Sequence, residues 1–270
     1  MTIKPNGDAG VRFCVSPCRS GSTMLLRAFS QHPDVACIYQ SVKSTLRQPG
    51  RLKHGIVNGH SDVDSYLVNK ETLGPHTIAE ATYEVFRDDV DVRLTRPIFL
   101  FRDPVRTWNG WKKQGWNDFD VFELAYLSCY KWFIFARSSL SSTLCVTYEQ
   151  LTSSPRLTTS RMLKYWGIPD RDLLQWGDNE DWRKKIIASD DFHASLKDGS
   201  FDHAIKSSTI ELALDEHLLV DKDRIRAIRR GPTGAIYRTV KRIAVTQCEA
   251  DQTPTPKFSK HKHRQSPKDA

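Results

Sequence analysis

A short segment rich in hydroxyl residues could bind a phosphate group. Residues 16–23 read Ser-Pro-Cys-Arg-Ser-Gly-Ser-Thr and lie between an apolar run and a helical pattern. At such a turn several backbone N–H groups point outward at a helix N-terminus and form an anion cradle. Arg19 adds a planar charged fork suited to phosphate, and Gly21 lets the backbone approach the anion closely. Three hydroxyl donors accompany them: Ser20, Ser22 and Thr23.

A second arginine, Arg102, directly follows the apolar run 97–101. Such a run is typical of a buried parallel strand, and ligands of open α/β sheets bind at the carboxyl ends of the strands. Arg102 and Arg19 could therefore face one ligand that carries two separated phosphate groups. The structural alternatives are a capped helix start with an exposed Arg19, and an ion pair between Arg102 and Asp103.

Alternating strand and helix patterns surround these residues. Apolar runs predict strands at 11–16, 35–39, 66–69, 97–101 and 144–147, and helical spacing predicts helices at 22–31, 119–140 and 155–166. We therefore expect an α/β fold in a single domain, with a central parallel sheet flanked by helices. This domain should cover residues 11–245, between a flexible N-terminus (1–10) and a disordered basic C-terminal tail (246–270).

The composition favours a soluble globular protein without a membrane span. Hydrophobic residues make up 39% of the chain, and no apolar run approaches the roughly 20 residues that cross a bilayer. The first ten residues are polar, so we expect no secretory signal and a cytoplasmic location. Six scattered cysteines form no zinc-like cluster, and we expect no metal.

The end of the chain is strongly basic. Residues 256–270 hold five lysine and arginine residues and one aspartate. Their net charge of 5 − 1 = +4 is half of the formal net charge of +8. We interpret this segment as a solvated tail and expect no nucleic-acid partner. The alternative interpretation is an arm for nucleic acid or a membrane surface.

Three segments resemble one known family, the sulfotransferases. Residues 17–23 (Pro-Cys-Arg-Ser-Gly-Ser-Thr) resemble the family's loop for the 5′-phosphosulfate, and residues 98–104 (Ile-Phe-Leu-Phe-Arg-Asp-Pro) resemble the strand and turn that bind the 3′-phosphate. Residues 146–151, Pro155 and residues 163–167 resemble the family's Tyr-Glu-Asp-Leu…Pro…Phe-Leu-Gly segment. The resemblance implies a P-loop NTPase-like sulfotransferase fold with 3′-phosphoadenosine 5′-phosphosulfate (PAPS) as co-substrate.

The resemblance also implies an activity and roles for single residues. The activity is transfer of a sulfo group to a hydroxyl or amine of a small-molecule acceptor. Residues 19–23 would hold the 5′-phosphosulfate, and Arg102 would hold the 3′-phosphate. Tyr148 would lie near the adenine, and Lys70 would contact the bridging or sulfuryl oxygens. A second pair for the 3′-phosphate resembles the family's C-terminal Arg-Lys-Gly element: Arg229 and Arg230.

The chain departs from the family pattern at three positions. Gly110 stands where the family has a serine that binds the 3′-phosphate, and Thr72 stands where it has a catalytic histidine. Other members carry a glutamate soon after the second strand, where this chain reads Tyr39-Gln40-Ser41. Two alternatives to the sulfotransferase therefore stay open. One is a sulfotransferase-like nucleotide-binding protein with altered or lost sulfonation. The other is a nucleoside triphosphate enzyme, although the loop lacks the Gly-Lys-Ser/Thr ending.

An acidic residue could serve as the general base. Glu71 follows Lys70 at the end of a predicted strand, and we predict that it accepts the proton of the acceptor. Strand alternation is the objection, because Glu71 and Lys70 then point to opposite faces. A structural role for Glu71 is the alternative, and His76 and Glu80 are the other candidates for the base.

Overall fold

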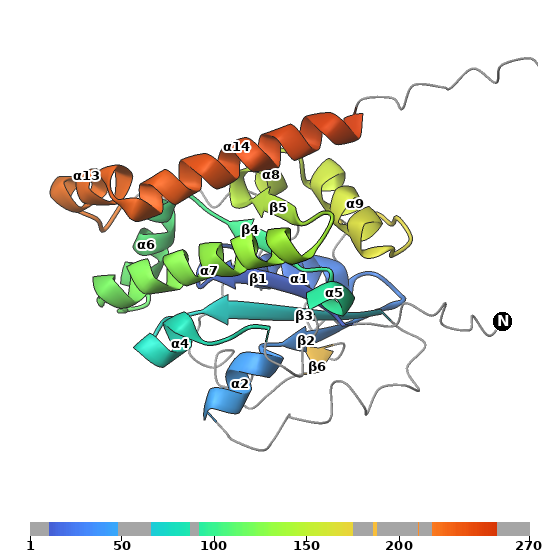
Figure 1. Ribbon diagram of the computed structural model, residues 1–270, viewed down its shortest axis with the longest axis horizontal. Helices are drawn as coiled ribbons and strands as arrows, with labels where there is room; N and C mark the ends of the chain where they lie inside the picture. Colours follow the sequence, from blue (N-terminus) through green and yellow to red (C-terminus); the bar gives the residue numbers. More distant parts are fainter. Residues whose placement is uncertain are drawn as a thin grey trace, which may run out of the picture.

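A parallel sheet of six strands forms the centre of the computed structural model (Figure 1). The strands lie in the order β5-β4-β1-β3-β2-β6, and every neighbouring pair is parallel. They span Arg12–Pro17 (β1), Val35–Tyr39 (β2), Tyr66–Leu73 (β3), Ile98–Phe101 (β4), Leu144–Thr147 (β5) and Ile186–Ile187 (β6). The structure describes residues 11–47, 66–86, 92–174, 186–187, 210 and 218–252. The predicted α/β class with a parallel sheet is confirmed.

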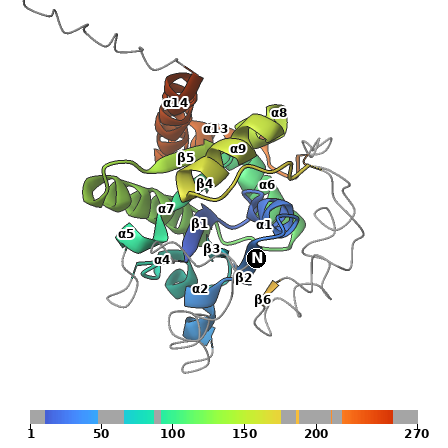
Figure 2. The ribbon, with the colours of Figure 1, turned by 90° about the vertical axis from the view of Figure 1, so that its right-hand side faces the viewer.

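Helices cover both faces of the sheet (Figure 2). One face packs against α7 (Phe119–Ser139) and α14 (Pro232–Gln252), and the other packs against α1 (Ser22–Ser30) and α9 (Pro155–Trp166). The shorter helices are α2 (Ser41–Arg47), α4 (Ile78–Thr82), α5 (Val92–Thr95), α6 (Pro104–Lys113), α8 (Tyr148–Ser153) and α13 (Lys222–Arg230). Among the helices of the described ranges, none is both long and apolar enough to cross a membrane.

The central strands are buried on both faces. In β4, Phe99 and Phe101 belong to the core beneath α7, whereas Ile98 and Leu100 belong to the core beneath α1 and α9. All four side chains are fully buried. Burial of each such side chain stabilises the fold by roughly 1.5–3 kcal/mol. The strand is therefore a rigid support for Arg102, the residue that follows it.

The order of the strands creates a crevice at one edge of the sheet. From β1 the chain passes through α1 to β2, which lies beyond β3 in the sheet. From β4 it passes through α6 and α7 to β5, which lies in the opposite direction along the sheet. Where neighbouring connections diverge in this way, a crevice opens outside the carboxyl ends of the strands. The loop after β1 and the turn after β4 meet at this crevice.

One strand is longer than the sequence predicted, and one helix crosses the predicted boundary between domain and tail. Strand β3 continues to Leu73 instead of ending at Asn69, because the polar residues at its end are buried within the sheet and do not form an apolar run. Helix α14 continues to Gln252, so residues 246–252 are helical and do not belong to the predicted tail. The reason is a contact with the edge strand β5: the side chain of Gln247 accepts a hydrogen bond from the N–H of Cys145 (3.0 Å) and donates one to the carbonyl of Thr143 (2.7 Å). The predicted N-terminal segment 1–10, the loop 48–64 and the rest of the tail lie outside the described residues.

Candidate functional site

The loop after β1, residues 18–21, is held by three neighbouring elements. The N–H of Cys18 donates to the carbonyl of Leu73 at the end of β3 (2.9 Å), and its carbonyl accepts from the indole of Trp111 in α6 (3.0 Å). Arg102, at the end of β4, donates from Nη1 to the carbonyl of Arg19 (3.3 Å). The backbone of the loop is therefore fixed from both sides of β1.

The conformation of this loop suits an anion. Arg19 and Gly21 both have left-handed backbones, with φ of 69° and 90°. Such turns form concave nests of N–H groups, and α1 begins directly after this one. Gly21 is the N-cap of α1 and provides no side-chain hydrogen bond, whereas an aspartate caps α6, α7 and α13. The hydroxyl of Ser20 is fully buried without a hydrogen-bond partner among the described residues. A phosphate or phosphosulfate group fits these donors.

Two features require glycine at position 21: its left-handed backbone and the side chain of Tyr148 beside it. A Cβ at this position would overlap the ring of Tyr148, the first residue of α8. The guanidinium of Arg102 lies over the same ring, 4.4 Å from its centroid, and both side chains are buried. The structure thus brings Tyr148, Arg102 and the loop together. Contact of Tyr148 with adenine stays a prediction.

Lys70 lies against the start of α1. Its Nζ donates to the hydroxyl of Thr23 (3.1 Å) and lies 4.1 Å from the ring centroid of Tyr39, and the residue is 3% exposed. The pKa of Lys70 is lowered to about 7, mainly by burial. The charge of Lys43 also lowers it, whereas Cys18, Cys14 and Glu71 act in the opposite direction. An anion in the loop would favour the charged form of Lys70.

Glu71 points away from the loop. Residues of β3 alternate between the two cores: Val68 packs beneath α1, on the side of Lys70, and Leu73 packs beneath α7, on the side of Glu71. Its carboxylate is fully buried and accepts five hydrogen bonds. They come from the Ser41 hydroxyl, the N–H groups of Val42 and Lys43, the Asn69 amide and the Tyr83 hydroxyl. The role of Glu71 as a base stays a prediction, and these contacts favour the structural alternative, since its oxygens already hold their donors.

Thr72, where the resemblance led to the expectation of a histidine, binds Gln40, which belongs to the segment 39–41 compared with the glutamate of other members. The amide of Gln40 donates to the hydroxyl of Thr72, and both residues are buried. Gln40 has a left-handed backbone, with φ of 53°, and its N–H donates to the carbonyl of Lys70 (2.8 Å). Thr72 shares the face of Lys70 by strand alternation. The pair therefore supplies polar groups beside Lys70 but no group that titrates near neutral pH.

The two other candidates for the base differ in their surroundings. Glu80 is buried and pairs with Lys43 (3.3 Å), whose Nζ also donates to the carbonyl of Gly74. His76 is exposed and packs its ring edge-on against Trp116, at 5.5 Å between centroids. Lys43 was not anticipated from the sequence, because no motif marks the segment after β2.

Arg229 and Arg230 lie on the last turn of α13, and both are exposed. Helix α13 packs on α6 and α14, and the carbonyl of Arg229 accepts a hydrogen bond from Arg238 (2.8 Å). Their predicted contact with the 3′-phosphate stays a prediction.

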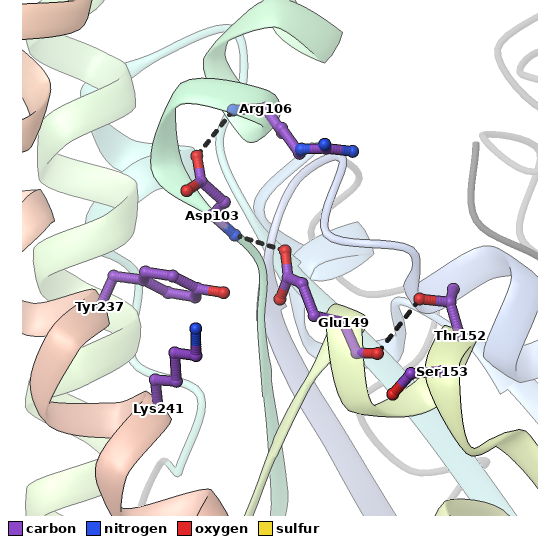
Figure 3. A pocket seen from close by; sticks show the side chains of 7 residues that line it. All are labelled: Asp103, Arg106, Glu149, Thr152, Ser153, Tyr237 and Lys241. Carbon is purple, nitrogen blue, oxygen red and sulfur yellow. Dashed lines mark hydrogen bonds between the residues drawn. The ribbon is translucent and has the colours of Figure 1, made fainter. Parts of the chain in front are cut away.

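A pocket of about 370 Å³ lies between the start of α6, α8 and α14 (Figure 3). It is lined by Asp103, Arg106, Glu149, Thr152, Ser153, Tyr237 and Lys241. Asp103 accepts hydrogen bonds from the N–H groups at the start of α6, and Glu149 accepts one from the N–H of Asp103 (3.1 Å). Burial raises the pKa of Tyr237, and the negative charge of Glu149 raises it to a lesser extent. From the sequence, Asp103 was considered as an ion-pair partner of Arg102.

Comparison with known proteins places the chain near the sulfotransferases in structure. No protein-family model and no curated sequence matches it. Among solved structures it is similar to mouse sulfotransferase SULT7A1 in complex with PAP, with 14% identity, 88% of this chain and 89% of that chain covered, and a TM-score of 0.47. It is also similar to retinol dehydratase in complex with retinol and PAP, with 14% identity, 90% and 81% covered, and a TM-score of 0.35. These similarities are too distant to transfer a ligand or an activity.

Glu71→Gln should lower the free energy of unfolding by about 1–3 kcal/mol, because the amide would turn an NH₂ group toward buried donors. Urea unfolding measures the difference, and Glu84→Gln, an exposed position, is the control. A variant as stable as the parent that has lost sulfo transfer would contradict the structural role and support the role as a base.

Proposed function

We propose that this chain binds PAPS at the carboxyl ends of β1 and β4 and transfers its sulfo group to a hydroxyl or amine of a small-molecule acceptor. The observation that carries the proposal is the meeting of three cationic or donor groups at one crevice: the loop at 18–21, Lys70 from β3 and Arg102 from β4. These groups come from three neighbouring parallel strands. Together they suit an elongated ligand with two anionic groups.

Each group has a place in such a reaction. PAPS, when bound, supplies an activated sulfo group and a phosphate leaving group. The acceptor oxygen or nitrogen attacks sulfur, the bond between sulfur and the bridging oxygen breaks, and the acceptor proton passes to a base or to water. The N–H groups of the loop and Lys70 would stabilise the negative charge that develops on the bridging oxygen. Arg102 would orient the nucleotide through its 3′-phosphate, and positioning of this kind contributes much of the rate.

A second candidate is a nucleotide-binding protein in which sulfonation is altered or lost. The bonded pair of Gln40 and Thr72 favours it, because neither side chain can accept a proton as a histidine or glutamate would. Incubation with PAPS and a panel of phenols, alcohols and amines separates the two candidates. Acceptors that gain the mass of a sulfo group support the enzyme. Tight nucleotide binding without any such product supports the second candidate.

Arg19→Ala and Arg102→Ala should each weaken binding of adenosine 3′,5′-bisphosphate by about ten- to a hundredfold, because each removes a charge-assisted hydrogen bond to phosphate. Isothermal titration calorimetry measures the affinities. Arg156→Ala is the control, since this exposed arginine pairs with Asp170. Unchanged affinity in both site variants would remove the basis of the proposal.

Binding of adenosine 3′,5′-bisphosphate at pH 8 should take up close to one proton at Lys70. The buried lysine, with a pKa of about 7, is mostly neutral at pH 8 in the free protein, and the bound anion raises that pKa. Calorimetry in buffers of different ionisation enthalpy counts the proton. Lys70→Met should abolish the uptake and Lys113→Met, an exposed position, should not. Equal uptake in all three proteins would contradict the assignment.

The same shift in pKa affects stability. Between pH 7 and the ordinary lysine value of 10.5, the unfolded chain holds a proton on Lys70 that the folded chain lacks. The free energy of unfolding that is linked to this group should therefore rise with pH across that range. In Lys70→Met this contribution should disappear.

A further inference from the structure

Gly110 makes room for the side chain of Arg19. A Cβ built on Gly110, which is buried in α6, would lie 3.1 Å from the Cβ and 3.6 Å from the Nε of Arg19. The aliphatic part of the Arg19 side chain therefore occupies the space into which a side chain at position 110 would extend. This is the position at which the sulfotransferase resemblance leads to the expectation of a serine ligand for the 3′-phosphate.

Arg106 lies one helical turn before Gly110 on the same face of α6, because residues four apart lie above one another on a helix. Arg102 precedes it by the same interval, at the entrance to the helix. Arg106 and Gly110 thus lie on one face of α6, and Gly110 lies beneath Arg19, whose carbonyl accepts a hydrogen bond from Arg102 in the turn before the helix.

The guanidinium group of Arg106 has unused hydrogen-bonding capacity. Its Nη1 is buried and has no hydrogen-bond partner among the described residues. Figure 3 shows the side chain extending away from Asp103 and from the two α14 residues, Tyr237 and Lys241. Asp103 and Oε1 of Glu149 accept hydrogen bonds from backbone N–H groups, and Oε2 of Glu149 is buried without a hydrogen-bond partner among the described residues. A buried guanidinium donor without an acceptor is unfavourable, and a bound anion would satisfy it.

We propose that Arg106 binds the 3′-phosphate of the nucleotide and that Arg19, lying over Gly110, takes the place of the missing serine. This inference rests on the proposed function and adds to it a residue outside the family motifs. The ligand class is a nucleoside 3′-phosphate. Two guanidinium groups would then replace one hydroxyl, and charge-assisted bonds to phosphate are about twice as strong as neutral ones.

The first test compares adenosine 3′,5′-bisphosphate with adenosine 5′-phosphate, which lacks the 3′-phosphate. Arg106→Met should weaken binding of the bisphosphate about ten- to a hundredfold and leave binding of the monophosphate unchanged. Lys113→Met, at an exposed position of the same helix outside the pocket, is the matched control and should change neither affinity. Unchanged binding of the monophosphate also shows that the Arg106 variant is folded.

The outcomes separate the two proposals. A parent protein that binds both nucleotides equally would contradict the proposed function itself. A parent that prefers the bisphosphate, with that preference retained in Arg106→Met, would overturn only the role of Arg106. Equal weakening of both nucleotides in Arg106→Met would also overturn it, because the effect would not depend on the 3′-phosphate.

The second test restores the serine of the family. Gly110→Ser should weaken binding of the bisphosphate severalfold, because the new Cβ displaces Arg19, and Gly110→Ala should do the same. Both variants should keep the melting temperature of the parent or exceed it, since alanine and serine favour a helix more than glycine does. Tighter binding in Gly110→Ser, or an affinity equal to that of the parent, would show that Arg19 does not replace the serine.

Discussion

The guanidinium group of Arg102 is the contact on which the site depends. It donates to the loop carbonyl of Arg19 and lies over the ring of Tyr148, whose edge fills the space beside Gly21. Because β4 is buried on both faces, this guanidinium has a rigid support. The need for glycine at position 21 follows from the left-handed backbone there and from the ring of Tyr148 beside it. The cradle is formed before an anion arrives, which lowers the entropy lost on binding.

Strand alternation separates the charges at the edge of the sheet. Lys70 and Arg102 end on the side of α1, where the loop lies, whereas Glu71, Asp103 and Glu149 end on the other side. The carboxylates there accept backbone hydrogen bonds from the first turns of α2 and α6 and from the turn after β4. Acidic groups thus support the helices that surround the crevice, and cationic groups face the crevice itself.

The separation of cationic from acidic groups helps to distinguish the two candidate functions. Donor binding has many supporting groups, because the cradle needs only backbone N–H groups, hydroxyls and cations. Proton transfer needs a titrating group in contact with the acceptor. Gln40 and Thr72 bind each other. The described part of the chain therefore combines a cationic, donor-rich loop region with a neutral pair beside Lys70.

The sequence by itself determined the strands and the residues that directly follow them. Apolar runs define β1, β4 and β5, so the loop at 18–21, Arg102 and Tyr148 could be placed at one edge of the sheet without coordinates. The tertiary structure alone decided the partners of Glu71, the extension of α14 over β5, and the contact of Arg19 with Gly110. The physical reason is that these features depend on packing between segments distant in the chain. A buried polar residue and a glycine in a helix carry no local signal of the neighbour that requires them.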